Sequence, residues 1–226
     1  MEKKNLILNF LFDKKNNWIN EYIKKKKFLK KNLIIRKYLD PKKIKKQEIV
    51  FVLGYTRKLS EKFLKSNKYV MIIHESDLPK GKGFSPLQWQ ILNNKNKITA
   101  CLFMATISFD SGDILFKNNI LLNGTELYEE IRQKQAITSI KLINKFLKYY
   151  PKIKRTKQVG NETFYKRRLP KDSEIDVNKS IKSQFNKLRI ANNEDWPSFF
   201  LHKKHVYTLK ILKKKTCINY LKKNLL

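Results

Sequence analysis

Short apolar runs rich in β-branched and aromatic residues recur along the first half of the chain, each followed by a more polar segment. Runs of this kind predict buried strands, and the segments between them have the spacing of helices. We expect strands at residues 5–12, 33–38, 48–55, 69–73 and 97–104. We expect helices at residues 18–29, at 57–64 and from residue 86. This alternation is typical of an α/β fold with a Rossmann-like, mostly parallel sheet and helices on both faces.

The longest helical pattern covers residues 125–149. It carries early glutamates, late lysines and an apolar stripe formed by Leu127, Ile131, Ile140, Ile143 and Phe146. The charge order suits the helix dipole, and the stripe predicts that one face is buried. We therefore expect this helix to serve packing.

The pattern changes at Tyr150-Pro151, after which residues 155–176 are polar and irregular. A helix at 178–188 and strands at 198–201 and 206–212 are expected beyond that segment. We therefore predict a main domain at residues 1–150 and a small C-terminal α+β extension with a hairpin at 151–226. The outer edge of the hairpin is unpaired, which makes it the candidate contact of a homodimer.

The chain has 226 residues, of which 41% are hydrophobic, and a formal net charge of +32. Its length allows one substantial core. Clustered Lys and Arg would indicate nucleic acid as a partner. Here the lysines are spread among many Asn and Ile residues, a pattern that AT-rich coding also produces, and dense runs such as 42–46 are typical of solvated faces. The positive electrostatic field of such a chain would equally steer an anionic small substrate toward it.

Cys101 and Cys217 are too far apart in the sequence to indicate a metal site or a disulfide framework, so we expect a reducing compartment. His202 and His205 are interpreted as part of a hairpin turn, and no metal is expected.

No apolar run is long enough to span a membrane, and none resembles a cleaved leader. The sequence thus predicts a cytoplasmic protein without a membrane partner. The first turn lacks a dinucleotide-binding glycine pattern.

His74 directly follows the strand at 69–73 and precedes a loop that contains Pro79, Gly81 and Gly83. Ligands of open α/β sheets bind outside the carboxyl ends of the strands, so His74 is a candidate functional residue. For the next helix, Ser85 is the expected N-cap, with Gln88 closing a capping box.

Asp110 lies in a tight Asp-Ser-Gly-Asp turn after the next strand. A lone histidine is more often a satisfied core residue, but a carboxylate beside it fixes its tautomer and raises its basicity. The two together favour a catalytic pair. The aromatic and basic segment 163–170 has two interpretations, either a wall of the same crevice or cover for a sheet edge.

Two blocks of residues carry a family resemblance. The first contains His74, Ser76, Leu78, Pro79, Gly83 and Pro86, and the second contains Asp110, Gly112 and Asp113. Together they resemble the folate-dependent formyltransferases, a group that includes methionyl-tRNA formyltransferase and the sugar N-formyltransferases. The similarity covers residues 48–200.

The resemblance implies a formyltransferase catalytic core at residues 1–150 that uses N10-formyltetrahydrofolate. It implies that His74 accepts a proton from the attacking amine and that Asp110 orients or charges His74. The implied cofactor contacts are Gly54, Tyr55, Ser108, Phe109, Gly112 and Asp113. The implied substrate contacts are Glu75, Ser76, Lys80, Lys82 and Gly83.

One position departs from the family pattern, because Ile72 stands where the family has a catalytic asparagine. Side chains two apart on a strand share a face, so Ile72 lies beside His74. In the family, the resemblance implies that the asparagine donates a hydrogen bond to the formyl oxygen. Losing one such donor to an oxyanion costs about 10²–10³-fold in rate. The candidates for a replacement donor are Ser76, a protonated Glu75 and a backbone N–H of residues 79–83.

Within the family, the intermediate length of the C-terminal extension is most similar to the sugar branch. The expected acceptor is therefore the amine of a nucleotide-linked amino sugar. The lysine content keeps transfer to methionyl-tRNA as the alternative enzyme activity. The third hypothesis is a catalytically impaired RNA- or ligand-binding protein on the same scaffold.

Overall fold

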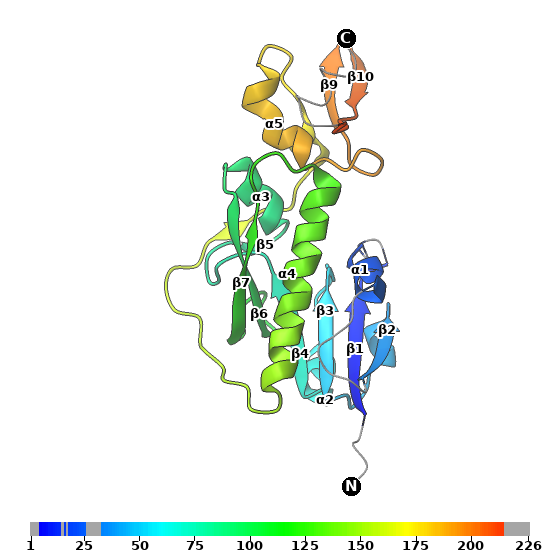
Figure 1. Ribbon diagram of the computed structural model, residues 1–226, viewed down its shortest axis with the longest axis vertical. Helices are drawn as coiled ribbons and strands as arrows, with labels where there is room; N and C mark the ends of the chain where they lie inside the picture. Colours follow the sequence, from blue (N-terminus) through cyan, green and yellow to red (C-terminus); the bar gives the residue numbers. More distant parts are fainter. Residues whose placement is uncertain (1–4, 15, 17, 26–32, 215–226) are drawn as a thin grey trace. The chain divides into compact units, whose positions relative to one another are not determined.

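The computed structural model describes residues 5–14, 16, 18–25 and 33–214. Its largest element is a six-stranded sheet with the order β2-β1-β3-β4-β6-β7 (Figure 1). The strands are β1 (Leu6–Phe12), β2 (Leu33–Tyr38), β3 (Ile49–Leu53), β4 (Tyr69–His74), β6 (Lys97–Met104) and β7 (Ile114–Leu121). The first four are parallel, while β6 and β7 are antiparallel to their neighbours. The predicted α/β fold with a mostly parallel sheet is confirmed.

Both faces of the sheet are covered by helices, as predicted. On one face, the Phe51 and Tyr69 rings each meet Phe146 of α4 (Tyr128–Tyr149) at 5.6 Å between centroids. On the opposite face, Val50, Val52 and Val70 form a core cluster that includes Phe63 of α2 (Glu61–Ser66). The alternation of side chains along the strands therefore builds two core layers.

The other α-helices described in this sheet region are α1 (Ile19–Lys25) and α3 (Pro86–Leu92), and a 3-10 helix covers Pro41–Lys43. Residues 26–29 of the predicted first helix lie outside the described residues. The predicted helix 57–64 begins later, because Ser60 is its N-cap and its Oγ accepts a hydrogen bond from the Phe63 N–H at 3.2 Å.

The predicted capping box of Ser85 and Gln88 is wrong. Ser85 has φ 51° and ψ 42°, in the left-handed region, and its side chain makes no capping hydrogen bond. A capping side chain needs an extended backbone to reach the N–H groups of the first turn. Here the Phe84 N–H already donates to the Tyr165 carbonyl at 3.1 Å, and the chain turns sharply after this contact.

Three strands were not expected from the sequence: β7, β5 (Lys82–Gly83) and β8 (Phe164–Tyr165). The pair β5 and β8 is parallel and joins segments about 80 residues apart. Strands of two residues leave no periodic signal in a sequence. Their pairing is decided by tertiary contacts alone.

The described residues divide into two compact units, one from those within residues 5–121 and 132–167 and the other from residues 122–131 and 168–214. The second unit contains a 3-10 helix (Pro170–Ser173), α5 (Ile181–Arg189), and the antiparallel strands β9 (Ser198–His202) and β10 (His205–Leu209). The predicted hairpin is confirmed. The predicted division of the chain at residue 150 stays a prediction.

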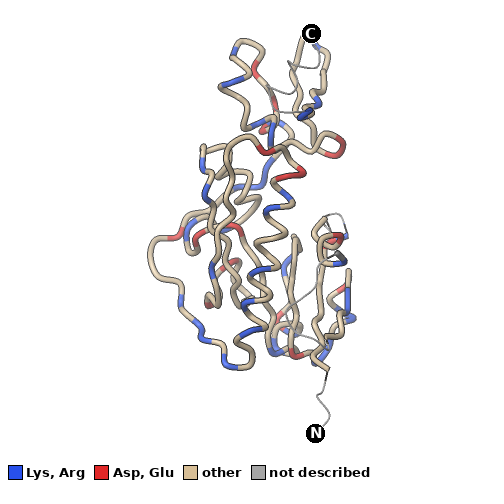
Figure 2. The backbone as a smooth tube through the Cα atoms, in the orientation of Figure 1, with Lys and Arg blue, Asp and Glu red and all other residues tan. Residues whose placement is uncertain are grey.

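Lys and Arg are spread over the elements of both units and do not concentrate on one of them (Figure 2). This distribution agrees with the interpretation of the charge as a general compositional property. Among the described residues, no helix combines the length and apolar character needed to cross a bilayer.

Candidate active site

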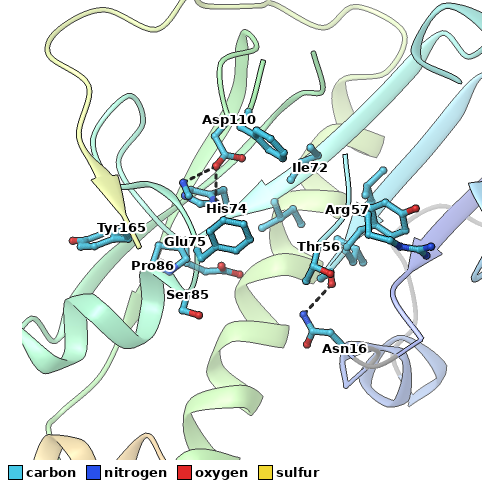
Figure 3. A pocket seen from close by; sticks show the side chains of 18 of the residues that line it. Asn16, Thr56, Arg57, Ile72, His74, Glu75, Ser85, Pro86, Asp110 and Tyr165 are labelled. Atoms are coloured by element: carbon cyan, nitrogen blue, oxygen red, sulfur yellow. Dashed lines mark hydrogen bonds and ion pairs between the residues drawn. The ribbon is translucent and has the colours of Figure 1, made fainter. Parts of the chain in front are cut away.

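His74 ends strand β4, where it pairs with Cys101 of β6, and 7% of its surface is exposed. Its Nε2 lies 2.8 Å from the Gly81 carbonyl oxygen, and its Nδ1 lies 3.8 Å from Oδ2 of Asp110 (Figure 3). A carbonyl oxygen only accepts hydrogen bonds, so Nε2 carries the proton in this contact. Nδ1 is then the nitrogen that can accept a proton, and the Asp110 carboxylate stabilises the imidazolium that results.

Asp110 reaches His74 through a loop and not from a neighbouring strand end. Strand β6 is antiparallel to β4, so its last residue Met104 lies opposite Met71. Residues 105–113 then bring Asp110, at φ 50°, to His74. Its Oδ2 also accepts a hydrogen bond from the Gly83 N–H at 2.9 Å. The carboxylate is thus held against the imidazole by the loop that follows β4.

Two further features fix the turn that contains Asp110. The Gln158 Nε2 donates to the carbonyl oxygens of Asp110 and Gly112, each at 2.8 Å. A Cβ atom at Gly112 would lie 1.7 Å from the Met104 carbonyl oxygen. Only glycine allows this close approach of the two backbones.

His74 and Asp110 line a cavity of about 540 Å³. This volume is in the range of small-molecule sites. Six other residues from the sequence-based site prediction line the same cavity: Gly54, Tyr55, Glu75, Gly83, Ser108 and Phe109. Burial raises the pKa of the Tyr55 phenol above its ordinary value.

The other residues of that prediction do not line the cavity. Ser76 is 2% exposed, and Lys80 is exposed. Gly112 supports the turn, and the Asp113 carbonyl accepts a hydrogen bond from the Met104 N–H at 2.9 Å. Lys82 is 1% exposed, and its ammonium donates to Ser111 Oγ at 2.8 Å and to the Glu162 carboxylate. Lys82 therefore links the loop that follows β4 and the loop at residues 105–113 to a third segment.

That third segment, residues 156–167, is named the strap. The Lys82 N–H donates to the Thr163 carbonyl at 2.9 Å, and the Gly81 N–H donates to Thr163 Oγ1 at 2.8 Å. Four strap residues line the cavity: Phe164, Tyr165, Lys166 and Arg167. Of the two interpretations of this segment, the aromatic and basic wall is confirmed.

The contact between Lys82 and Glu162 predicts an asymmetric stability effect. Replacing Glu162 with alanine leaves a buried ammonium with one hydroxyl partner, at an expected cost of about 2–3 kcal/mol. Replacing Lys82 with methionine keeps the packed stem and leaves Glu162, whose side chain is 51% exposed, to be solvated. We expect that variant to cost about 1 kcal/mol or less. Urea unfolding checks both values, and a larger cost for Lys82→Met would contradict this reasoning.

Sequence reasoning missed the contribution of α4 to the site. Arg132, Gln135 and Ser139 line the cavity from positions i, i+3 and i+7, which share one face of a helix. The helix packs on the sheet as expected, and it also contributes polar side chains to the cavity. The sequence did contain a signal for this contribution, because polar residues recur at helical spacing beside the apolar stripe. In the structure, Gln135 and Ser139 are only 5% and 3% exposed.

Ile72 cannot donate the hydrogen bond that an asparagine would give to the oxyanion, and the structure leaves few other donors near it. Ile72 lines the cavity, as its place beside His74 predicts. Pro79 has no N–H, and the Lys80 N–H donates to the Asp77 carbonyl at 3.1 Å. The N–H groups of residues 81–83 donate to Thr163 and Asp110, as described above. The loop 79–83 therefore offers no free backbone donor, and Ser76 does not line the cavity.

A model of the formyl transferase family matches residues 10–145. Among curated relatives, the bifunctional polymyxin resistance protein ArnA of Wigglesworthia glossinidia brevipalpis is 31% identical over 159 residues, which are 69% of this chain and 24% of that protein. The methionyl-tRNA formyltransferase of Clostridium beijerinckii is 28% identical over 179 residues, 76% of this chain and 57% of that protein. The chain thus spans about half the length of the methionyl-tRNA formyltransferases that it matches.

Solved structures share the fold. A methionyl-tRNA formyltransferase from Clostridium thermocellum has a TM-score of 0.75 at 21% identity, covering 94% of this chain and 95% of that one. A 4-N formyltransferase from Francisella tularensis has a TM-score of 0.70 at 16% identity, covering 93% and 98%. HypX from Aquifex aeolicus, solved with tetrahydrofolic acid, has a TM-score of 0.66 at 13% identity, covering 90% and 37%.

The formyl donor of the matched family is N10-formyltetrahydrofolate. The match extends over more than half of the chain and includes the strand that carries His74, the Asp110 turn and most of α4. On this evidence, the chain belongs to the formyl transferase family.

Proposed function

We propose that this protein transfers a formyl group from N10-formyltetrahydrofolate to a primary amine on a nucleotide-bearing acceptor. The observation that carries the proposal is the geometry of His74. Its Nε2 is engaged by the Gly81 carbonyl, while its Nδ1 lies 3.8 Å from the Asp110 carboxylate at a cavity wall. An imidazole arranged in this way accepts a proton from an attacking amine.

The lining of the cavity fits a folate. Apolar side chains of Val52, Leu53, Ile107 and Phe109 offer a surface for a flat ring system. Arg57 and Lys58 follow β3 and offer cations for an acidic tail. When bound, the cofactor supplies a formyl group attached to nitrogen. The residues of this chain hold it, exclude water and take the proton of the acceptor amine at His74 Nδ1.

The side chains of the strap favour a formyl acceptor that carries a nucleotide. Phe164 is 64% exposed and can stack on a base, while Lys166 and Arg167 can pair with phosphate. Two acceptors share this chemistry, the methionyl end of initiator tRNA and a nucleotide-linked amino sugar. Structures that share the fold include N-formyltransferases of sugars, whereas the sequence relatives favour methionyl-tRNA. We place methionyl-tRNA first because similarity over most of this chain is the more direct support.

The test follows tetrahydrofolate release from N10-formyltetrahydrofolate with each acceptor. One arm uses initiator methionyl-tRNA, and the other uses dTDP-, UDP-, GDP- and CMP-linked amino sugars. We expect acceptor-dependent release that falls about a hundredfold in Asp110→Asn, because the imidazolium loses its carboxylate. Asp77→Asn is the matched control, since Asp77 is exposed on the same loop as the site and pairs with Lys117. No release with any acceptor would refute the proposal.

A further inference from the structure

Glu75 directly follows His74, and its side chain lines the cavity (Figure 3). Its Oε1 accepts a hydrogen bond from the Gln135 Nε2 at 2.6 Å, and its backbone carbonyl accepts one from the Gln90 Nε2 at 2.6 Å. Both donors come from helices, α4 and α3, packed on the same segment. Glu75 is therefore held in place by hydrogen bonds to both its backbone and its side chain.

The donor that holds Glu75 is itself fixed. Gln135 is 5% exposed, and its Oε1 accepts a hydrogen bond from Arg132 Nη1 at 2.8 Å. The Arg132 guanidinium in turn lies over the Trp18 ring, 4.6 Å from its centroid. The Arg132 contact turns the amide so that its NH₂ points at Glu75. Gln135 therefore presents a hydrogen-bond donor, and not its carbonyl oxygen, to the Glu75 carboxyl group.

Glu75 has no cationic partner among the residues that the structure describes, although the chain is strongly basic. The sequence has 51 Lys and Arg residues against 19 Asp and Glu residues. The nearby carboxylates are paired, Asp77 with Lys117 and Asp110 with His74. Within the part of the chain that the structure describes, no Lys, Arg or His nitrogen forms an ion pair with Glu75. Removing a carboxylate from water costs free energy unless it is paired, so a cation that enters the cavity would be stabilised beside Glu75.

We propose that Glu75 binds the acceptor in its ammonium form and so selects primary amines over hydroxyl-bearing analogues. This inference rests on the proposed function, because an amine acceptor is protonated in neutral solution. Glu75 and His74 line the same cavity, so an ammonium held by the second carboxylate oxygen of Glu75 would share that cavity with the proton acceptor His74. In this role Glu75 is a hydrogen-bond acceptor. It is then not the missing oxyanion donor, because only a protonated Glu75 carboxyl could donate a hydrogen bond to the oxyanion.

The test measures binding without catalysis. Two ligand pairs are used: 3′-methionylamino-3′-deoxyadenosine with its α-hydroxy counterpart, and a dTDP-linked 4-amino sugar with its 4-hydroxy counterpart. Calorimetric titration at neutral pH is performed on the wild type, Glu75→Gln, Glu75→Asp and the control Asp77→Asn. Gln has the shape of Glu and still accepts the Gln135 hydrogen bond, and circular dichroism confirms that each variant is folded.

For at least one pair, we expect the wild type and Asp77→Asn to bind the amine about 10–100-fold more tightly than the hydroxyl analogue, as for a charge-assisted hydrogen bond. Glu75→Gln should lose this preference, and Glu75→Asp should keep part of it. In steady-state kinetics, Glu75→Gln should raise the KM of the amine acceptor and leave that of the folate unchanged.

Three results would overturn the inference: equal binding of amine and hydroxyl by the wild type, no binding of either amine, or a preference that survives in Glu75→Gln. Failure of the proposed function has a different signature, which is absence of formyl transfer by the wild type. An amine preference that depends on Glu75 would support the binding role even then.

Discussion

Replacing His74 with alanine is expected to lower kcat for formyl transfer by about 10²–10⁴-fold, the range for loss of a general base. The reason lies in the two contacts of the ring. The Gly81 carbonyl holds the proton on Nε2, so Nδ1 beside Asp110 is the proton acceptor in this arrangement. The KM for the folate is expected to change little, because most of the cavity wall is unaltered. Steady-state kinetics with saturating acceptor measures both quantities.

A histidine elsewhere in the chain provides the control. His205 is exposed and begins β10, and His205→Ala should retain wild-type kcat. Because His74 is buried, circular dichroism and thermal unfolding must show that His74→Ala is folded at the assay temperature. A fall in kcat of less than tenfold in a folded His74→Ala protein would show that another group takes the proton.

Replacing Ile72 with asparagine is expected to raise kcat by about 10²–10³-fold, the value of one oxyanion donor. Ile72 lies on the same cavity as His74, and its hydrocarbon cannot donate a hydrogen bond to the oxygen of the formyl group. The loop 79–83 has no free N–H, and Ser76 is outside the lining. A carboxamide at position 72 would supply the donor that is lacking. Single-turnover measurements isolate the chemical step.

The gain in rate should be accompanied by a loss of stability. Ile72 packs against the cluster of Leu78, Cys101, Phe103 and Ile114, so a polar side chain there is expected to cost about 1–3 kcal/mol. Ile72→Val is the matched control, because it shortens the side chain without adding a donor and should leave kcat near the wild-type value. An unchanged kcat in Ile72→Asn would mean that another donor already serves the oxyanion.

The comparison of sequence and structure separates local from nonlocal information. The sheet strands β1, β3, β4 and β6 were predictable because each is a mostly apolar run, and such runs are buried whatever they pair with. Strand β2 was also predicted, but the expectation that it is buried was wrong, because its residues are exposed or half-buried. His74 was predictable because a strand ends there and turn residues begin. Hydrogen bonding between distant segments left no such signal, so β5, β8 and the left-handed backbone of Ser85 were missed or predicted wrongly.

The same division applies to the site. The amino-acid sequence alone determined which residue types are available, the α/β class, the strand that presents His74 and the likeness to formyltransferases. Tertiary structure alone decided how Asp110 reaches His74, because β6 is antiparallel and a loop must fold back from its far end. It also decided that Lys82 joins loops, while Gln135 holds Glu75 at the cavity. These roles depend on side chains from segments 29 to 60 residues apart, and chain spacing carries no information about which of them meet.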